Sequence, residues 1–397
     1  MTEPVCLSAL GLVNALGNNK TEVLGRLMAG DGSGMVLESD WLPDGREALV
    51  GKVTGELPAI AQHLHRYNCR NNRLLLAALA QIETDVAAAI EHFGPSRVGV
   101  IVGTSTSGIA EGEVAISALR NRGAMPSDFN YAAQEIGSAA PFLAAHLGLS
   151  GPAYTISTAC TSSAKALVSA RMMLAAGLCD AVIAGGADSL CRLTVSGFAA
   201  LESVSSQRCN PMSISRCGIN IGEGAALFLV TREVGKVSLL GCGESSDAYH
   251  MSAPQPDGLG AEAAMRAGLA DANISAKDIG YVNLHGTATP KNDEMESRAM
   301  QRVFPEGVPT SSTKPLTGHL LGAAGVTEAA FCWLALSDYN KRMPPHIWDG
   351  EGDPKLPTLE LVKPGDKHNM RRGHRYMMSN GYAFGGSNVS LILGVAS

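Results

Sequence analysis

The sequence predicts an α/β fold in which helices cover a mostly buried sheet. Short β-branched runs alternate with Ala- and Leu-rich stretches of helical length, which is the pattern of βαβ units. The 397 residues are 45% hydrophobic and only 17% charged, a composition that excludes a disordered chain. The chain also contains 45 glycines. An average chain of this length holds roughly 28, so we expect many tight turns and close approaches of the backbone.

Apolar runs bounded by glycine or polar clusters mark the strands, and longer Ala-rich stretches mark the helices. In chain order, we expect a helix at 73–92, a strand at 98–102, a helix at 163–176, strands at 181–184, 226–230 and 237–240, a helix at 261–272, a strand at 279–284, a helix at 325–338 and a strand at 389–393. The helices at 163–176 and 325–338 are apolar on nearly every face and should be buried. Most strands run into glycine or polar residues, and sites in open α/β sheets gather at such carboxyl ends. A weak division of the chain falls near residue 235, where a new strand opens.

The overall charge and the amino-terminal segment exclude several classes of protein. The formal net charge is -6, which provides no basic face for nucleic acid. Met1 to Gly17 has no basic segment followed by an apolar core, so it does not predict a signal peptide. No uninterrupted apolar stretch approaches the ~18 residues of a membrane span. The nine cysteines are scattered without CxxC spacing, which indicates a reduced, cytoplasmic chain.

The segment YTISTACTSSAKALVSA, residues 154–170, places Cys160 at a turn between a short strand and a helix. The positive end of the helix dipole stabilises a thiolate there, and it is expected to lower the pKa of the thiol from about 8.5 to near 7. Most of the nine cysteines are expected to be buried structural residues. The small residues from Ser157 to Ser163 leave room for a substrate, however, and they favour Cys160 as a nucleophile.

Two of the ten histidines lie in turns that follow strands. His285 enters a polar turn in NLHGTATPKNDEME, and His319 precedes a Gly- and Ala-rich helix in STKPLTGHLLGAAG. For either histidine alone, a hydrogen-bonded structural role is the more frequent one, and no HExxH or short His/Cys pair supports a zinc site. Asp293 and Glu296 could mimic a carboxylate pair but are interpreted as acids in the first turn of a helix. SNGYAFGGSN, residues 379–388, is a glycine-rich turn that is uninformative by itself.

Taken together and in this order, these segments resemble the β-ketoacyl-acyl carrier protein synthases of the thiolase superfamily, of the stand-alone elongating type. The resemblance covers nearly the whole chain. It is carried by the motifs ALG, TACTSS, GGADS, GINIGEGAA, SSDAYHMSAPQPDG, HGTATPKNDEME, STKPLTGHLLGAAG and NGYAFGGSN. The family implies a thiolase fold, five-layered αβαβα, made of two related βαβαβαββ halves. These halves would be residues 1–235, with the cysteine, and residues 236–397, with the two histidines.

The resemblance implies a decarboxylative Claisen condensation of an acyl chain with malonyl-acyl carrier protein, giving a β-ketoacyl-acyl carrier protein. Cys160 would hold the acyl chain as a thioester, which is nucleophilic catalysis. His285 and His319 would donate hydrogen bonds to the malonyl thioester carbonyl and stabilise the enolate that remains when carbon dioxide departs. The backbone N–H groups of Cys160 and Phe384 would hold the oxyanion of the condensation step, and Phe384 also matches the gating position of the family.

Four further site residues are implied by the resemblance. Thr287 and Thr289 match threonines that contact the phosphopantetheine arm. Lys314 and Glu328 match a buried charged pair that orients the site. No metal and no cofactor are implied, because the phosphopantetheine belongs to the acyl carrier protein.

Several positions depart from the family pattern and bear on the subtype. The usual RPFD before RDG is NPMS at residues 210–213. Ala383 replaces the usual glycine beside the gate, and Ser387 replaces the usual threonine. Thr106 lies in the gate-loop stretch GTSTSG, where an isoleucine is common. These changes concern the acyl pocket, and they favour ketosynthases of bacterial aryl polyene and related specialised clusters over a housekeeping fatty acid enzyme.

Two alternative functions share this fold. A chain-length-factor subunit is non-catalytic and typically lacks the cysteine. A degradative thiolase pairs a cysteine with one histidine and a second cysteine. The combination of Cys160 with His285 and His319 favours the decarboxylating condensation over both.

The expected partners follow from the same resemblance. They are an acyl carrier protein and either a second copy of the chain or a chain-length-factor-like subunit. The carrier protein is acidic in this family, so a basic docking patch is expected beside the site entrance, with Arg66, Arg70, Arg73 and Arg208 as candidates.

Overall fold

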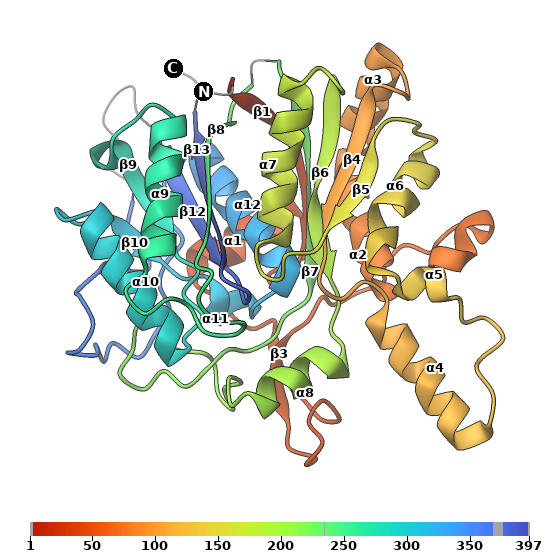
Figure 1. The fold of residues 1–397 in the computed structure, drawn as a ribbon, viewed down its shortest axis with the longest axis horizontal. Helices are drawn as coiled ribbons and strands as arrows, with labels where there is room; N and C mark the ends of the chain where they lie inside the picture. Colours follow the sequence, from red (N-terminus) through yellow and green to blue (C-terminus); the bar gives the residue numbers. More distant parts are fainter. Residues whose placement is uncertain (1–2, 234, 368–375, 396–397) are drawn as a thin grey trace.

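The strands form one large mixed sheet, with a small separate hairpin beside it (Figure 1). The computed structural model of the chain describes residues 3–233, 235–367 and 376–395. The strands of the large sheet are β1 (Val5–Val13), β4 (Val98–Gly103), β5 (Ala153–Ile156), β6 (Ala181–Asp188), β7 (Gly224–Thr231), β8 (Ser238–Ser246), β9 (Ile279–Asn283), β10 (Pro309–Ser311), β11 (Glu360–Leu361), β12 (Tyr376–Tyr382) and β13 (Ser387–Gly394). The hairpin consists of β2 (Met35–Glu38) and β3 (Ala48–Gly51).

Helices cover both faces of the large sheet. The α-helices among the described residues are α1 (Lys20–Ala29), α2 (Arg70–Leu79), α3 (Glu83–Phe93), α4 (Ile109–Arg122), α5 (Tyr131–Gln134), α6 (Ala139–Leu147), α7 (Ser162–Ala175), α8 (Arg192–Ala200), α9 (Leu259–Asp271), α10 (Pro290–Val303), α11 (Lys314–Thr317) and α12 (Ala324–Ser337). Every strand predicted from a β-branched run is present, with ends that differ by a few residues, and the helices expected at 163–176, 261–272 and 325–338 are α7, α9 and α12.

The single helix expected at 73–92 was wrong. The segment is α2, a 3₁₀ turn over Ala80–Ile82 and α3, with a change of direction at Ile82. The physical reason is Gln81, whose side-chain amide donates to the carbonyl of Leu12 in β1 and accepts from the backbone N–H of the same residue. The helical stretch breaks where this side chain binds the backbone of the sheet.

The large sheet consists of two halves with the same topology. Its strand order is β11-β10-β9-β12-β13-β8-β1-β7-β6-β4-β5, and β1 and β8 pair over only two residue pairs at the junction. In the first half, β5, β4 and β6 are parallel neighbours in this order, β7 is antiparallel to β6, and β1 is antiparallel to β7. In the second half, β10, β9, β12, β13 and β8 repeat this arrangement, and the short strand β11 extends the edge beside β10. Residue 235 falls between β7 and β8, the last strand of one half and the first of the next.

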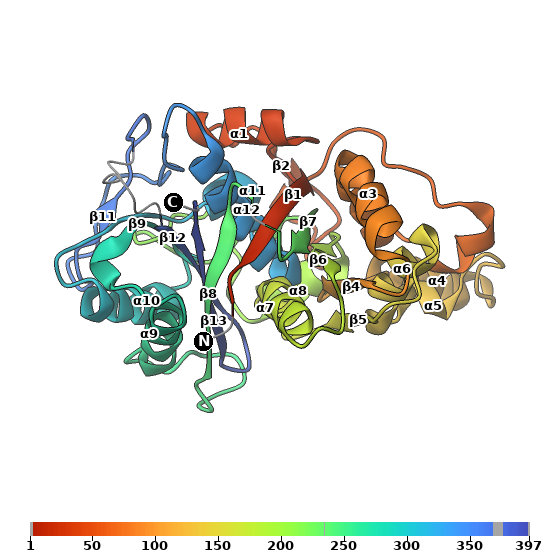
Figure 2. The same cartoon turned by 90° about the horizontal axis from the view of Figure 1, so that it is seen from above.

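The helices and the two halves of the sheet form five layers (Figure 2). Helices α2, α3 and α6 pack on the outer face of the first half, and α9 and α10 cover the outer face of the second. Helices α7 and α12 lie between the halves and contact both, with α12 buried along nearly its whole length. The predicted αβαβα thiolase fold and the burial of both central helices are confirmed.

The first turns of α7 and α12 approach each other closely in the central layer. A Cβ atom on Gly325 would lie only 2.7 Å from the Cβ of Ala164, so a glycine is required at this contact. The hydroxyl of Ser163 also accepts the backbone N–H of Val326. Cys160 precedes α7 and His319 precedes α12, so this contact sets the distance between the two side chains.

Two further observations bear on the sequence-based expectations. In the described part of the chain, no helix combines the length and the apolar character that crossing a membrane requires. All nine cysteines are free thiols.

Candidate active site

Cys160 lies in a strained turn between β5 and α7. Ala159, directly before it, has a φ of +53°, in the left-handed region that an alanine rarely adopts. The hydroxyl of Ser162 donates to the Ala159 carbonyl over 2.6 Å and accepts the N–H of Thr158 over 2.9 Å. These two bonds hold the turn, and they leave the Cys160 thiol buried, with 6% of the residue exposed.

The expected pKa near 7 for Cys160 was wrong. Burial raises the pKa of this thiol to about 12, and the charges of Asp188 and Glu328 act in the same direction. The Lys314 charge and the backbone N–H of Phe384 favour the thiolate but do not offset the burial. The helix dipole considered in the sequence is weakened because α7 begins only at Ser162. The resting thiol is therefore protonated, and a nucleophilic role would need a base beside it.

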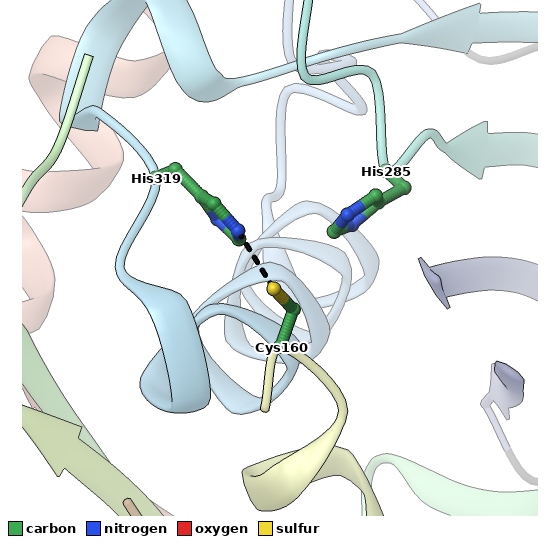
Figure 3. A group of neighbouring side chains, drawn as sticks. All are labelled: Cys160, His285 and His319. Atoms are coloured by element: carbon green, nitrogen blue, oxygen red, sulfur yellow. Dashed lines mark hydrogen bonds between the residues drawn. The ribbon is translucent and has the colours of Figure 1, made fainter. Parts of the chain in front are cut away.

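His319 lies beside the thiol. It is held by its backbone, whose N–H donates to Asn220 O over 2.7 Å and whose carbonyl accepts from Gly222 N over 3.0 Å. Its Nε2 lies 3.0 Å from the Cys160 Sγ (Figure 3). Burial, with the charge of Lys314, holds the pKa of His319 well below its ordinary value. The imidazole is therefore neutral and has one nitrogen free to accept a proton.

His285 faces the same point from the end of β9. Its ring centroid lies 5.3 Å from that of His319, with the two rings nearly perpendicular. Its pKa is also held well below the ordinary value by burial, by Lys314 and by His319. Within the described residues, neither histidine has a hydrogen-bond partner at Nδ1. Figure 3 shows both rings directed toward the sulfur.

Asp293 and Glu296, interpreted from the sequence as first-turn acids, are fully buried and hold the turn that carries His285. Glu296 lies in the second turn of α10 and accepts the backbone N–H groups of His285 and Gly286 over 2.8 and 2.7 Å. Asp293 accepts those of Ala288 and Met212 over 3.2 and 2.8 Å. Burial raises the pKa of Asp293 to about 6 and that of Glu296 to about 7. Glu296 lies eleven residues from His285, whose N–H it binds, so no local sequence pattern indicates this contact.

Lys314 and Glu328 form the buried pair that the resemblance implies. Their charged atoms lie 2.5 Å apart, and 2% and 4% of the residues are exposed. The Lys314 ammonium also donates to the backbone carbonyl of His285. The pair thus connects α11 and α12 to the turn that carries His285.

We expect Lys314→Met or Glu328→Gln to lower the free energy of unfolding by about 3 to 5 kcal/mol, because each leaves a buried charge unpaired. Urea unfolding followed by circular dichroism measures this loss. The double variant Lys314→Met/Glu328→Leu should regain most of the stability without regaining activity, because the hydrogen bond to His285 stays broken. A double variant no more stable than the single ones would contradict the pairing.

The catalytic side chains open into a cavity of about 320 Å³. Thr287 and Thr289 line it, with their hydroxyls 2.9 Å apart. Phe384 lines the same cavity, is 36% exposed and has its ring 5.4 Å from that of Phe198 on α8. Ala383 lies beside it.

Other predicted residues lie away from the cavity. Thr106 is fully buried, and its hydroxyl and its N–H both bond to Asp188. None of the four arginine candidates is among the residues that line the cavity, and Arg70 is ion-paired with the buried Glu223. The exposed basic residue on the cavity wall is Lys291, at the start of α10.

The Cys160 sulfur and one ring nitrogen of each histidine lie within 4.8 Å of one another. That spacing would also allow a metal ion to bind the three side chains. The expectation that the site uses no metal stays a prediction.

The chain is similar to two models of one family. Residues 2–234 match the β-ketoacyl synthase N-terminal domain, and residues 237–347 match the β-ketoacyl synthase C-terminal domain. The chain is 32% identical to 3-oxoacyl-[acyl-carrier-protein] synthase 2 of Vibrio cholerae, with 98% of both chains covered. It is 36% identical to the protein of the same name from Vibrio harveyi, with 80% of both covered.

Solved structures show the same similarity. A ketosynthase (ApeO), in complex with its chain length factor (ApeC) from Xenorhabdus doucetiae, is 46% identical and superposes with a TM-score of 0.94, covering 99% of this chain and 98% of that one. A β-ketoacyl synthase from Burkholderia phymatum is 29% identical, with a TM-score of 0.85 over 100% of both chains.

Proposed function

Because the chain belongs to the β-ketoacyl synthase family, we propose that Cys160 carries the growing acyl chain and that His285 and His319 decarboxylate the extender unit. The enzyme is a β-ketoacyl-acyl carrier protein synthase, an acyltransferase of fatty acid and polyketide chain elongation. The observation that carries the residue roles is one buried cavity in which the Cys160 sulfur lies 3.0 Å from His319 Nε2 and the His285 ring faces both.

The first half-reaction transfers the acyl chain to the enzyme. The Cys160 Sγ attacks the acyl thioester carbonyl while His319 Nε2 takes the thiol proton. The bond from the carbonyl carbon to the carrier sulfur breaks, and the proton passes from His319 to the departing thiol. His319 is neutral, so its Nε2 can take the proton, but burial makes it a weak base and the thiol a weak acid. The proton therefore moves in the same step as the sulfur attacks, without a free thiolate.

The second half-reaction breaks and forms a carbon–carbon bond. Before the second half-reaction, the His319 proton moves to Nε2, the nitrogen that faces the site. The malonyl carboxylate then leaves as carbon dioxide, and the electron pair moves into an enolate whose oxygen accepts hydrogen bonds from the Nε2–H of His319 and a ring N–H of His285. The enolate carbon attacks the acyl-Cys160 carbonyl. The backbone N–H groups of Cys160 and Phe384 hold the resulting oxyanion. Its collapse breaks the bond from the carbonyl carbon to Cys160 Sγ, and the thiolate that is released takes up one proton from water.

The proposal extends to the residues that contact the phosphopantetheine arm, to the Phe384 gate and to the need for a cofactor. Thr287 and Thr289 contact phosphopantetheine along the cavity wall, and the Phe384 ring moves to admit malonyl after acylation. Ala383 shapes the acyl pocket beside the gate, whereas Thr106, expected there from the sequence, bonds to Asp188 away from the cavity. No cofactor or metal takes part, because the arm comes with the carrier protein, and Lys291 lies where the acidic carrier would dock. We also propose a cytoplasmic location, in keeping with nine free thiols.

Intact-protein mass spectrometry after incubation with acyl carrier proteins of varied chain length and unsaturation tests the proposed function. We expect a single acyl adduct that maps to Cys160 and disappears when malonyl-carrier protein is added. An adduct on another residue would overturn the assignment of the nucleophile. The chain length that gives the fastest adduct also reports the acyl specificity.

The two alternative functions find less support in the site. A non-catalytic chain-length-factor role leaves the complete Cys160, His285 and His319 arrangement without a use. A degradative thiolase would need a second cysteine, and Cys160 is the one cysteine among the described residues that line the cavity.

We propose that the pathway is a specialised one of the aryl polyene type. The 46% identity to the ApeO ketosynthase exceeds the 32% and 36% to the two 3-oxoacyl-[acyl-carrier-protein] synthase 2 relatives. The unusual NPMS loop supports the same subtype. Ser213, Ser215 and Asn210 all donate to one carboxylate oxygen of Asp349, a hydroxyl-based anchor that the RPFD pattern does not contain.

We propose that the partner subunit is chain-length-factor-like and that it covers the edge of the sheet at β5 and the projecting helix α4. All four residues of β5 are partly exposed, and an edge strand offers unpaired backbone groups to a partner. On and after α4, Val114, Leu119 and Tyr131 are 65%, 42% and 63% exposed. Exposed apolar side chains grouped in this way mark interaction surfaces.

We expect Val114→Glu/Tyr131→Glu to weaken assembly with the partner by at least about tenfold, because two charges would enter an apolar interface. Sedimentation of the chain alone and with a co-expressed chain-length-factor subunit measures the strength of this assembly. Leu37→Glu, at an exposed leucine of the hairpin, is the matched control. Unchanged assembly of the double variant would contradict this surface, and a stable homodimer that excludes the subunit would contradict the heterodimer.

A further inference from the structure

Asp188, the last residue of β6, is a fully buried carboxylate with five hydrogen-bond donors. Its Oδ1 accepts the hydroxyls of Thr104 and Thr106 over 2.7 and 2.8 Å. The same oxygen accepts the backbone N–H groups of Ser105 and Thr106 over 2.7 and 2.8 Å. Its Oδ2 accepts the N–H of Gly322 over 2.5 Å. In the described part of the chain, no lysine or arginine pairs with it, so neutral donors alone stabilise the carboxylate.

The five donors belong to two segments on opposite sides of the reacting pair. Residues 104–106 follow β4 and contact the nucleophile turn, where the Ser105 hydroxyl donates to the carbonyl of Ala159 over 3.3 Å. Gly322 lies in the 3₁₀ turn Leu321–Ala323, directly after the segment of His319. One side chain therefore ties the segment beneath Cys160 to the segment that carries His319.

We propose that Asp188 is a positioning residue of the condensation, which keeps His319 Nε2 within hydrogen-bond distance of the Cys160 sulfur by holding both segments. This inference rests on the proposed roles of Cys160 and His319. It adds a residue that contacts neither the substrate nor the reacting atoms.

The contact geometry favours an ionised carboxylate at this position. All five groups that face the two oxygens donate, four of them to Oδ1, and these bonds oppose the effect of burial, which raises the pKa of Asp188. An asparagine would place an NH₂ group against at least one of these N–H donors. The segments are also built for close approach, since a Cβ on Gly322 would lie 2.9 Å from Asp188 Oδ2 and 2.7 Å from the Ser105 hydroxyl.

The charge of Asp188 also acts on the reactivity of the Cys160 thiol, in the direction opposite to its effect on the rate of condensation. Around the Cys160 thiol, Asp188 and Glu328 raise the pKa, whereas Lys314 and the Phe384 N–H lower it. The two histidines that face the thiol are neutral. Removing the Asp188 charge should therefore make the thiol more reactive, even while the loss of positioning makes the enzyme slower.

The test compares Asp188→Asn with the wild-type enzyme in two assays. In steady-state condensation, kcat should fall by about ten- to a hundredfold, with KM for malonyl-carrier protein nearly unchanged, because a misplaced base slows the chemistry rather than the binding. In the absence of any carrier protein, alkylation of Cys160 by iodoacetamide, followed by mass spectrometry across a pH series, should be faster at each pH.

Two matched variants distinguish the effect of the lost charge from the effect of the lost positioning. Thr106→Val removes one donor but keeps the charge, so it should slow condensation without speeding alkylation. Asp293→Asn removes a buried carboxylate on the His285 side, and alkylation of Cys160 should keep its wild-type rate. If Asp188→Asn does not fold, Thr104→Val/Thr106→Val takes its place, with a lower kcat and no faster alkylation expected.

Condensation by Asp188→Asn at the wild-type kcat would overturn the proposal. So would alkylation that is no faster than wild type, or alkylation that Thr106→Val accelerates equally. A wild-type kcat for Thr104→Val/Thr106→Val would overturn it as well. The alkylation assay uses no acyl substrate, so its outcome is independent of whether the condensation itself is assigned correctly.

Discussion

Cys160→Ala is expected to abolish condensation while decarboxylation of malonyl-carrier protein continues. Acyl transfer needs the sulfur as nucleophile, and its loss should lower condensation on the order of 10⁴-fold or more. Decarboxylation depends on the hydrogen bonds from His285 and His319, which this substitution leaves in place. Chromatography of the β-ketoacyl product and release of labelled carbon dioxide measure the two reactions in one sample.

The structure offers a matched control for this experiment. Cys209 is equally buried, its pKa is also raised to about 12 by burial, and it does not line the cavity. Cys209→Ala should therefore keep both reactions. Undiminished condensation by Cys160→Ala, or loss of condensation in Cys209→Ala alone, would contradict the proposed nucleophile.

Replacing either histidine by alanine should lower decarboxylation by about 10²- to 10³-fold, because each removal takes away one donor to the enolate oxygen. The two variants should differ in the first half-reaction. His319 Nε2 contacts the Cys160 sulfur, so His319→Ala should also slow acylation of the enzyme. His285→Ala should acylate at close to the wild-type rate. Single-turnover mass spectrometry of the acyl adduct separates the two steps.

The pH dependence provides an independent check on the same pair. Burial lowers the pKa of both imidazoles, so the neutral donors persist well below the ordinary histidine pKa. Decarboxylation should then be flat between about pH 6 and pH 8, the range in which an unperturbed histidine titrates. A step in the rate near the ordinary histidine pKa would contradict the neutral pair.

In the experiment with the two alanine variants, equal rates of acylation would show that His319 takes no part in the proton shuttle.

Local sequence patterns predicted those parts of the fold that depend on local chemistry. The β-branched runs became strands, and the two helices that are apolar on every face became the central layer. The break at Gln81 was missed because it depends on a bond to Leu12, far away in the chain. No helix-forming preference at residues 73–92 reports such a contact.

The residues of the candidate site also fall into those that local sequence patterns predicted and those that they did not. Cys160, His285 and His319 were found because each follows a strand in a turn of small or polar residues. The contacts of Asp188 and Glu296 were missed because their partners, backbone groups and for Asp188 also the hydroxyls of Thr104 and Thr106, are brought near only by folding. The pKa of Cys160 was misjudged for a related reason, since burial is a property of the packed structure and outweighs the dipole of one helix.

The repeated topology of the two halves has a consequence for how such a site can arise. Cys160 follows β5, the third strand of its half, and His319 follows β10, the third strand of the other. The two side chains thus follow equivalent strands of the two halves. Two identical subunits would be bound by symmetry to present the same residue at both positions. Joining the halves in one chain releases that constraint, so the two equivalent turns can carry different residues, a cysteine in one half and a histidine in the other.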